Sequence, residues 1–327
     1  MDLVNLTTKI LRSLSNATLG PRGALFIFHR MSRKDTWSQL LDNGFYLNES
    51  FMDEFLTYLS VQGWDFVTIE EAVHRSQSGD FSRKFVNFSL DDCYRDTYEI
   101  AVPLFRRHKA PLTLYLTTGI PDNTLALWAA GIEDTLMTRD RVELEEGPLF
   151  LTDHASRVAA FQALFSAWDE NGAASRYARF CALNGIDQEA MHWKHAMSWE
   201  MLETVKHDPY VEIGGHTINH PHVADLDRDQ AAHEIGGCLA RITEKLGIPA
   251  KHFAFPYGRA KDCSARDFAL ARELGLGSAA TTVKGLVYAG QDPMRLPRIT
   301  LNGKHQSLAM MEAHLSGLTA LAGSLKS

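Results

Sequence analysis

Short apolar runs alternate with helix-like stretches along most of this chain, and this alternation constrains its fold more than any other feature. The runs have the length of buried strands and occur at residues 24–28, 66–69, 85–90, 112–117, 211–215, 252–255, 278–282 and 295–301. Stretches with helical spacing of apolar residues lie between them, at 51–59, 101–105, 230–246, 265–274 and 306–322. Repeated strand–helix units of this kind predict an α/β fold with a parallel sheet and helices outside it.

The segment 119–199 breaks this alternation. It contains few strand signals and many alanines, and Val158, Phe161 and Phe165 recur there at helical spacing. Because a loop of this length without structure of its own is uncommon in a compact domain, we expect a helical insertion. Residues 1–20 are expected to form an N-terminal amphipathic helix, packed on the edge of a single domain that covers 1–327.

Composition narrows the class of protein. Of the 327 residues, 45% are hydrophobic and 22% charged, as in ordinary globular proteins. A formal net charge of −7 disfavours nucleic acid as a partner, and no stretch approaches the roughly 20 apolar residues of a membrane span. The four cysteines lie far apart without a Cys-x-x-Cys spacing, which fits a reducing compartment. Without an apolar leader-like run near Met1, we expect a cytoplasmic protein.

Polar residues follow three of the predicted strands directly. Asp91 and Asp92 follow one strand, His216 follows a second after two glycines, and Tyr257 follows a third. In a β/α barrel the carboxyl ends of parallel strands carry the chemistry, so we expect these side chains to lie close together.

The spacing of His216 and His220 suggests a metal site. If the residues after Gly215 form one helical turn, both imidazoles lie on one face. A catalytic zinc usually takes three protein ligands and leaves a position for water, so a carboxylate is also required. Asp91 and Asp92 repel each other unless a cation or a proton separates them. The working hypothesis is that one aspartate binds the ion and the other is a base.

Each motif also has a simpler interpretation. One His-x-x-x-His among 14 histidines is a weak signal, and an aspartate pair is often a turn or a helix N-cap. Their joint occurrence after apolar strands is more specific than either motif alone. His222 is a rival ligand, although Pro221 interrupts the local geometry and favours a solvated or supporting role.

These motifs resemble those of the polysaccharide deacetylases, the NodB-homology carbohydrate esterases. The family's Thr-Phe-Asp-Asp-Gly motif appears as Ser-Leu-Asp-Asp-Cys at 89–93, its His-Ser/Thr-x-x-His motif at 216–220, and its Pro-Tyr turn at Pro256 and Tyr257. The similarity covers residues 24–303, and it implies a distorted (β/α) barrel of about seven strands.

The resemblance also implies roles for individual residues. Carried over position by position, it implies that Asp92, His216 and His220 bind a divalent metal, which we expect to be Zn²⁺. Asp91 is implied as the general base that takes a proton from the attacking water. Tyr257 is at the family's position for holding the oxyanion through a backbone N–H.

The implied function is a metal-dependent hydrolase that removes N-acetyl groups from a polysaccharide or oligosaccharide of the N-acetylglucosamine type. Pro256 and Tyr257 are then expected to contact the carbohydrate. The 119–199 insertion is expected to cover one side of the cleft and select the substrate. Trp128 is its candidate for stacking on a sugar, although a core position is the more common one for such a tryptophan.

The chain departs from the family pattern at several positions. Cys93 replaces a glycine, and Ala254 replaces an arginine that steadies the base in many members. Arg298, from a late strand, could supply that charge or could be a surface residue. The family's late Leu-x-His motif, which supplies a general acid, is not recognisable. His305 matches it only loosely, and His29, at the end of the first strand, is either a better placed acid or a structural histidine.

Two other functions remain open at this point. A related barrel hydrolase of a small non-sugar amide would use the same residues. A catalytically impaired carbohydrate-binding barrel is favoured by Cys93 and the missing acid, and disfavoured by the intact aspartates and histidines. A non-haem iron site also uses two histidines and a carboxylate, but the β/α pattern and the adjacent aspartate argue against it.

Overall fold

A curled parallel sheet is the centre of the molecule. The computed structural model describes residues 23–33, 36–168 and 170–317. Within these ranges seven strands pair in the order β11-β10-β9-β6-β5-β1-β12, and β4 pairs with β5 outside this path. The eight strands are β1 (Gly23–Phe28), β4 (Asp65–Phe66), β5 (Phe85–Asp92), β6 (Leu112–Leu116), β9 (Val211–Gly215), β10 (His252–Ala254), β11 (Ser278–Ala280) and β12 (Ile299–Thr300).

The two ends of this sheet approach each other. Leu296, just before β12, donates its N–H to the carbonyl of Ala279 in β11 at 3.0 Å, and it accepts from the N–H of Thr281 at 2.9 Å. β12 itself pairs in parallel with β1 at the other end of the path. The predicted distorted (β/α) barrel of about seven strands is therefore confirmed.

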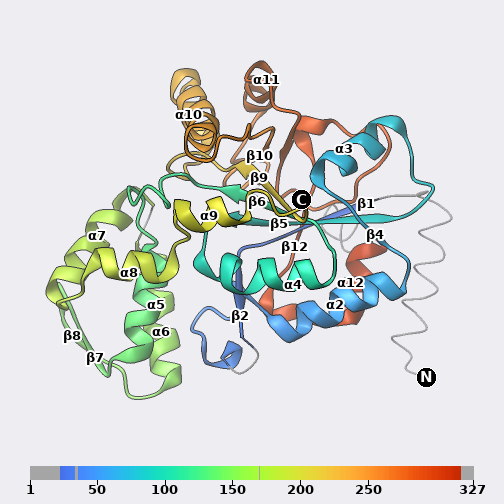
Figure 1. The fold of residues 1–327 in the computed structure, drawn as a ribbon. Helices are drawn as coiled ribbons and strands as arrows, with labels where there is room; N and C mark the ends of the chain where they lie inside the picture. The colour runs from blue at the N-terminus through green and yellow to red at the C-terminus, as the bar shows by residue number, and fades with distance from the viewer. Residues whose placement is uncertain (1–22, 34–35, 169, 318–327) are drawn as a thin grey trace, which may run out of the picture.

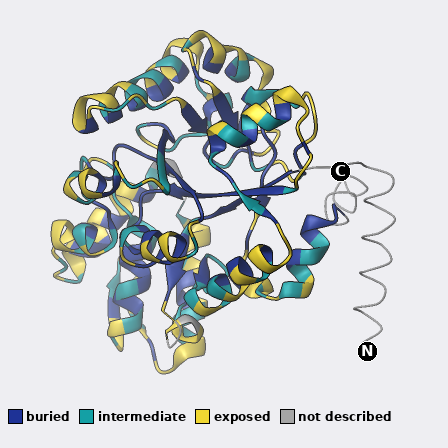
Figure 2. Ribbon diagram, turned by 45° about the vertical axis from the view of Figure 1, so that its right-hand side comes forward, coloured by how far each residue is buried: buried dark blue, intermediate teal, exposed yellow. Residues whose placement is uncertain are grey.

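Helices cover the outer face of the barrel. In Figure 1, α2, α4 and α12 lie on one side of the sheet, and α10 and α11 lie on the opposite side. Figure 2 shows the sheet as the buried centre, with helices that expose only their outer faces. The helices around the barrel are α2 (Glu49–Val61), α3 (Ile69–Ser78), α4 (Val102–Arg107), α9 (Trp199–Val205), α10 (Arg228–Leu246), α11 (Ala265–Glu273) and α12 (Leu308–Leu315).

The chain leaves the barrel between β6 and β9 and forms a separate small unit, seen at the lower left of Figure 1. Its helices and hairpin are α5 (Trp128–Thr138), β7 (Arg141–Leu144), β8 (Gly147–Phe150), α6 (His154–Ala167), α7 (Glu170–Leu183) and α8 (Gln188–His195). Ile132, Phe161 and Phe180 belong to a hydrophobic core of its own. The antiparallel hairpin β7–β8 was not indicated by the sequence.

Strand β5 has two different faces. Val86, Phe88 and Leu90 pack outward into the core beneath the helices. Asn87, Ser89 and Asp91 have the opposite parity, and since side chains alternate along a strand they point into the barrel. All eight residues of β5 are buried. The polar residues of this strand therefore form part of the inside of the barrel, where they need partners.

Several predicted strands are shorter than expected: 295–301 is a strand only at 299–300 and 278–282 only at 278–280, and the strand predicted at 66–69 also ends early. β4 ends at Phe66, and Ile69 begins α3 in place of ending the strand. The hydroxyl of Thr68 accepts the backbone N–H of Glu71, which is the N-cap arrangement that starts a helix. The capping preference of Thr68 therefore prevails over the apolar run around it.

Several further expectations concern the ends of the chain and its cysteines. The predicted N-terminal helix 1–20 lies outside the described residues, as does the end of the predicted helix 306–322. Among the residues that the structure describes, no helix combines the length and the apolar character needed to cross a bilayer. All four cysteines are free and buried, at Cys93, Cys181, Cys238 and Cys263.

Candidate active site

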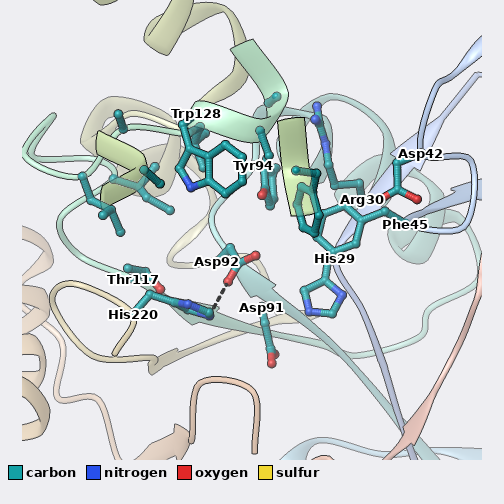
Figure 3. A pocket seen from close by; sticks show the side chains of 18 of the residues that line it. His29, Arg30, Asp42, Phe45, Asp91, Asp92, Tyr94, Thr117, Trp128 and His220 are labelled. Atoms are coloured by element: carbon teal, nitrogen blue, oxygen red, sulfur yellow. Dashed lines mark ion pairs between the residues drawn. The ribbon is translucent and has the colours of Figure 1, made fainter. Parts of the chain in front are cut away.

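A pocket of about 660 Å³ opens at the carboxyl ends of the barrel strands. Its floor contains Asp91, Asp92, His216 and His220, and the other side is lined by the insertion. Figure 3 shows Asp91, Asp92 and His220 on the floor, with Trp128 of the insertion across from them. The insertion therefore lies on one side of the cleft that contains the strand-end residues, as predicted.

Three of the predicted side chains converge on one point. Asp92, His216 and His220 each offer one ligand atom, and these atoms lie within 4.8 Å of one another. Oδ1 of Asp92 is 3.7 Å from Nε2 of His216 and 3.4 Å from Nε2 of His220, the contact drawn as a dashed line in Figure 3. Two imidazoles and a carboxylate are a common ligand set for a catalytic divalent metal.

Backbone conformation, not a helical turn, aims these side chains. The predicted helical turn after Gly215 is wrong, because Thr217 and His220 adopt left-handed φ values of 67° and 59°. Strand alternation would direct Asp92 away from Asp91, but its own φ of 81° ends the strand there. The metal-site loop and the aspartate thus both depend on left-handed residues other than glycine, a costly conformation that is concentrated at functional sites.

Glu234 of α10 holds the loop between the two histidines. Its carboxylate accepts the backbone N–H groups of Ile218 at 3.0 Å and Asn219 at 2.9 Å, and the side-chain amide of Asn219 at 2.7 Å. Sequence reasoning missed Glu234, since it lies on a separate helix with no motif spacing to the histidines.

The histidines present the right nitrogen. Nδ1 of His216 is 2.6 Å from the carbonyl of Ala254, and a carbonyl only accepts, so Nδ1 carries the proton and Nε2 has a free lone pair. Nδ1 of His220 lies 3.2 Å from the hydroxyl of Tyr257. Burial lowers the pKa of both imidazoles to about 4, which keeps them neutral at neutral pH, as metal ligands must be.

The carboxylate of Asp92 has an oxygen without a hydrogen-bond partner in the part of the chain that the structure describes. Its Oδ1 is buried and has no hydrogen-bond donor among the described residues. Burial raises the pKa of Asp92, and the charge of Asp91 adds to this. An unpaired buried carboxylate oxygen is costly, and a divalent cation beside it would remove that cost. The residues present therefore fit a metal ion.

Asp91 has a different environment, although it is the next residue. Both its oxygens accept from the guanidinium of Arg298, at 2.8 Å each, and Arg298 also donates to Ser89 and to the carbonyl of Thr281. Burial raises the pKa of Asp91, but Arg298 and His216 lower it more, so that it lies below its ordinary value. The structure thus brings Arg298 to the aspartate, where Ala254 leaves no charge.

The other candidate histidines differ in their position relative to the pocket. His29 lines the pocket and stacks on Phe45 at 4.7 Å, beside the aspartates in Figure 3. His222 does not belong to the metal group, because its Nδ1 pairs with Asp262 at 2.9 Å. His305 is exposed and does not line the pocket.

The two residues of the Pro-Tyr turn differ in position. Tyr257 lines the pocket, has a left-handed φ of 59°, and stacks on His222 with ring centroids 3.9 Å apart. Pro256 is buried and does not line the pocket, so the structure gives no contact surface for its predicted role in substrate binding. Cys93 keeps a φ of 118°, which means that its side chain is accommodated in a conformation that favours glycine.

The structure adds aromatic residues that sequence reasoning did not assign to the site. On the insertion side, Phe165 lines the pocket and stacks at 5.3 Å on Trp128, the predicted stacking residue, which also lines it. Outside the insertion, Phe45 and Tyr94 line the pocket near His29. The four-residue spacing of Phe161 and Phe165 indicated a helix face, but the sequence did not indicate that this face is turned toward the aspartates.

Comparisons with known proteins identify the family of the chain and support its fold. A family model described as "Polysaccharide deacetylase" matches residues 78–277. Among solved structures, a Streptococcus pyogenes deacetylase, PplD, is 15% identical with a TM-score of 0.58, over 86% of this chain and 94% of that one. IcaB from Ammonifex degensii is 16% identical with a TM-score of 0.57, over 90% and 97% of the two chains. An Aggregatibacter actinomycetemcomitans de-N-acetylase is 13% identical with a TM-score of 0.57, over 90% and 99%. At such identities the likeness is one of fold, and no curated protein shows significant sequence similarity to the chain.

Proposed function

The chain belongs to the polysaccharide deacetylase family, and on this premise we propose that it is a metal-dependent hydrolase that removes N-acetyl groups from saccharides of the N-acetylglucosamine type. The observation that carries the proposal is that two adjacent aspartates on one pocket floor have different partners. Asp92 belongs to a group with His216 and His220, and Asp91 is ion-paired with Arg298. One carboxylate is suited to a cation and the other to a proton.

Asp92, His216 and His220 would hold the metal, and zinc is the ion that we propose. When bound, a divalent ion there would supply the positive charge that polarises an amide carbonyl and makes water more acidic. The unpaired Oδ1 of Asp92 and the free Nε2 of His216 support this ligand set.

Asp91 would act as the general base. A base must be ionised before water attacks, and the Arg298 guanidinium favours that state by holding the pKa of Asp91 below its ordinary value. The bidentate contact also fixes the orientation of the carboxylate. Asp91 takes the proton as the water oxygen bonds to the acyl carbon.

The remaining steps complete hydrolysis. The backbone N–H of Tyr257 is proposed to donate to the oxyanion of the tetrahedral intermediate. The C–N bond then breaks, and the amine leaves with a proton while acetate is formed. His29, on the pocket floor beside the aspartates, is the proposed donor of that proton. A catalytically impaired barrel would have no need for the Arg298–Asp91 pair, and that pair supports an active enzyme.

The test is an assay for acetate release from N-acetylglucosamine oligomers, with metal analysis of the same sample. We expect release that is lost with a chelator and restored by adding a divalent metal. Metal-loaded protein that releases acetate from none of these oligomers would count against the proposed activity. The free, buried cysteines support the further proposal that the protein works in a reducing compartment such as the cytoplasm.

A further inference from the structure

The insertion gives the pocket a wall with almost no polar side chains. Apart from the indole N–H of Trp128, residues 125–130, Phe161, Phe165 and Ala173 contribute apolar side chains to it. Among the insertion residues whose side chains the structure describes, Glu133 is the charged one that lines the pocket. Its carboxylate already accepts the backbone N–H groups of residues 41 and 42 and the hydroxyl of Tyr46, so it has little capacity left for a ligand.

Such a wall is poorly suited to a sugar polymer. Each sugar hydroxyl is both a donor and an acceptor, and a buried hydroxyl without a partner costs about 1–3 kcal/mol. Trp128 can stack on one ring and offers one N–H donor, but the apolar side chains around it offer neither donors nor acceptors to the hydroxyls at the ring edges. A chain of sugars lying along this wall would therefore leave several hydroxyls unpaired.

The wall is also an available surface and not simply the insertion's core. Phe165 stacks on Trp128 at 5.3 Å and on Phe161 at 5.8 Å, yet it remains 48% exposed. The same cavity contains Asp91 and Asp92. A group that lies on the wall therefore belongs to the molecule whose amide reaches the floor.

We propose that the substrate is an amphiphilic sugar amide, in which an aliphatic or aromatic group lies on the wall formed by Trp128, Phe161 and Phe165. This inference rests on the proposed function and names its substrate class. The apolar group is a hydrophobic aglycone on the sugar, because the proposed function makes the acyl part of the amide an acetyl group, which has a single methyl.

A substrate series tests the proposal with metal-loaded protein. Release of the sugar amine or the acid is measured for N-acetylglucosamine, its octyl β-glycoside, N-octanoylglucosamine and the N-acetylglucosamine tetramer. We expect kcat/KM to be higher for the octyl glycoside than for N-acetylglucosamine, by up to about fourfold for each methylene that contacts the wall. A gain only with the octanoyl amide would overturn the assignment of the wall to the aglycone. A tetramer that exceeds both alkyl compounds would overturn the proposal.

Two phenylalanines of the insertion provide a matched pair of variants. Phe165 lines the pocket, whereas Phe150 is 63% exposed at the end of β8 and does not line it. Because both are exposed, Phe165→Ser and Phe150→Ser are expected to fold. The ratio of kcat/KM for the alkyl compound to that for N-acetylglucosamine should fall in Phe165→Ser and stay unchanged in Phe150→Ser. An equal ratio in both variants would remove the wall from substrate selection.

A binding experiment separates this inference from the proposed function. Hexyl β-glucoside has no amide, so its binding, measured by calorimetry, requires no turnover. We expect it to bind the wild type and Phe150→Ser, and to bind Phe165→Ser more weakly. Binding without any amide hydrolysis would sustain the wall and reject the deacetylase activity. Hydrolysis of N-acetylglucosamine without binding of hexyl glucoside would support the deacetylase activity and reject the role of the wall.

Discussion

The floor of the pocket consists of hydrogen-bonded polar groups, whereas the wall consists mainly of apolar side chains. On the floor, Asp91 has its two oxygens paired with Arg298, and the histidine loop is fixed by Glu234. The wall presents aromatic and aliphatic side chains, with Trp128 and Phe165 in contact only through their rings. The floor comes from strand ends in the barrel, and the wall comes from a unit with a separate core.

This difference separates chemistry from selection. Polar groups held by several hydrogen bonds can be kept in one orientation, which proton transfer and metal binding require. Apolar contacts have little directionality, so they tolerate variation in the group that they bind. We therefore expect changes on the floor to affect rate and metal content, and changes on the wall to affect which substrate is preferred.

The largest effect should follow removal of both histidines of the floor. The double variant with His216→Ala and His220→Ala should lose the metal and all measurable hydrolysis, because one carboxylate alone binds a divalent ion weakly. Metal content by elemental analysis is the readout. His222→Gln is the matched control from the same loop, since His222 pairs with Asp262 and is outside the metal group. Full metal content in the double variant would show that the ligands lie elsewhere.

The next effect distinguishes the two aspartates. Asp91→Asn should keep the metal and lose rate by about 10²–10⁴-fold, the usual range for loss of a general base. Asp92→Asn should lose the metal itself, because an amide replaces the charged oxygen at the group of three. Metal content and kcat are measured on both variants. If the metal stays in Asp92→Asn and leaves Asp91→Asn, the roles are reversed.

Arg298 should have a smaller effect with a distinct signature. Removing the guanidinium raises the pKa of Asp91, since burial then acts on that carboxyl with less compensation. As the proposed base, Asp91 would act only when ionised, so the acidic limb of the pH–rate profile should move to higher pH in Arg298→Ala. The loss of charge-assisted hydrogen bonds predicts a fall in kcat of roughly 10- to 100-fold, with metal content unchanged.

Two further variants support the reading of the Arg298 experiment. Arg298→Lys keeps the charge without the planar fork and should recover part of the rate. Arg295→Ala removes an exposed arginine from the same segment and should leave the pH profile in place. An unshifted acidic limb in Arg298→Ala would limit the role of Arg298 to stability.

The smallest effect concerns the attachment of the wall. Glu133→Gln keeps the size of the side chain but weakens its hydrogen bonds to Leu41, Asp42 and Tyr46. We expect the free energy of unfolding to fall by about 1–3 kcal/mol. Hydrogen exchange at the amides of Leu41 and Asp42 should become faster, and KM should change more than kcat. Glu146→Gln, in the exposed turn of the β7–β8 hairpin, is the control. Unchanged exchange in Glu133→Gln would mean that the wall is held by other contacts.

Most of the floor could be predicted because its signals are local in sequence. Asp91 and Asp92 follow an apolar strand directly, and the histidine pair follows another, so barrel geometry alone brings them together. Arg298 is a predicted partner only through the family resemblance, because Ala254 stands where many members carry an arginine. The contact is present, whereas its catalytic role stays a prediction. The helical turn at the histidines was wrong because left-handed residues such as Thr217 carry no clear sequence signal.

The wall could not be predicted in the same way. Helical spacing around Phe161 indicates a helix with an apolar face, but not what that face contacts. Its direction depends on contacts that are distant in sequence, such as Glu133 with Leu41 and Cys93 with Met197. The expectation that the insertion covers one side of the cleft came from its position in the chain, and the structure places its residues in the pocket.

Three of the buried cysteines make the two parts of the molecule separately observable in solution. Cys181 lies in the core of the insertion, whereas Cys93 and Cys238 lie in the core of the barrel. Burial raises the pKa of each of these thiols, so they react with thiol reagents only when the surrounding structure opens. The rate at which Cys181 is modified therefore reports opening of the insertion, and the rates at Cys93 and Cys238 report opening of the barrel. Opening of each region can therefore be measured from the modification rate of a native cysteine, without any introduced label.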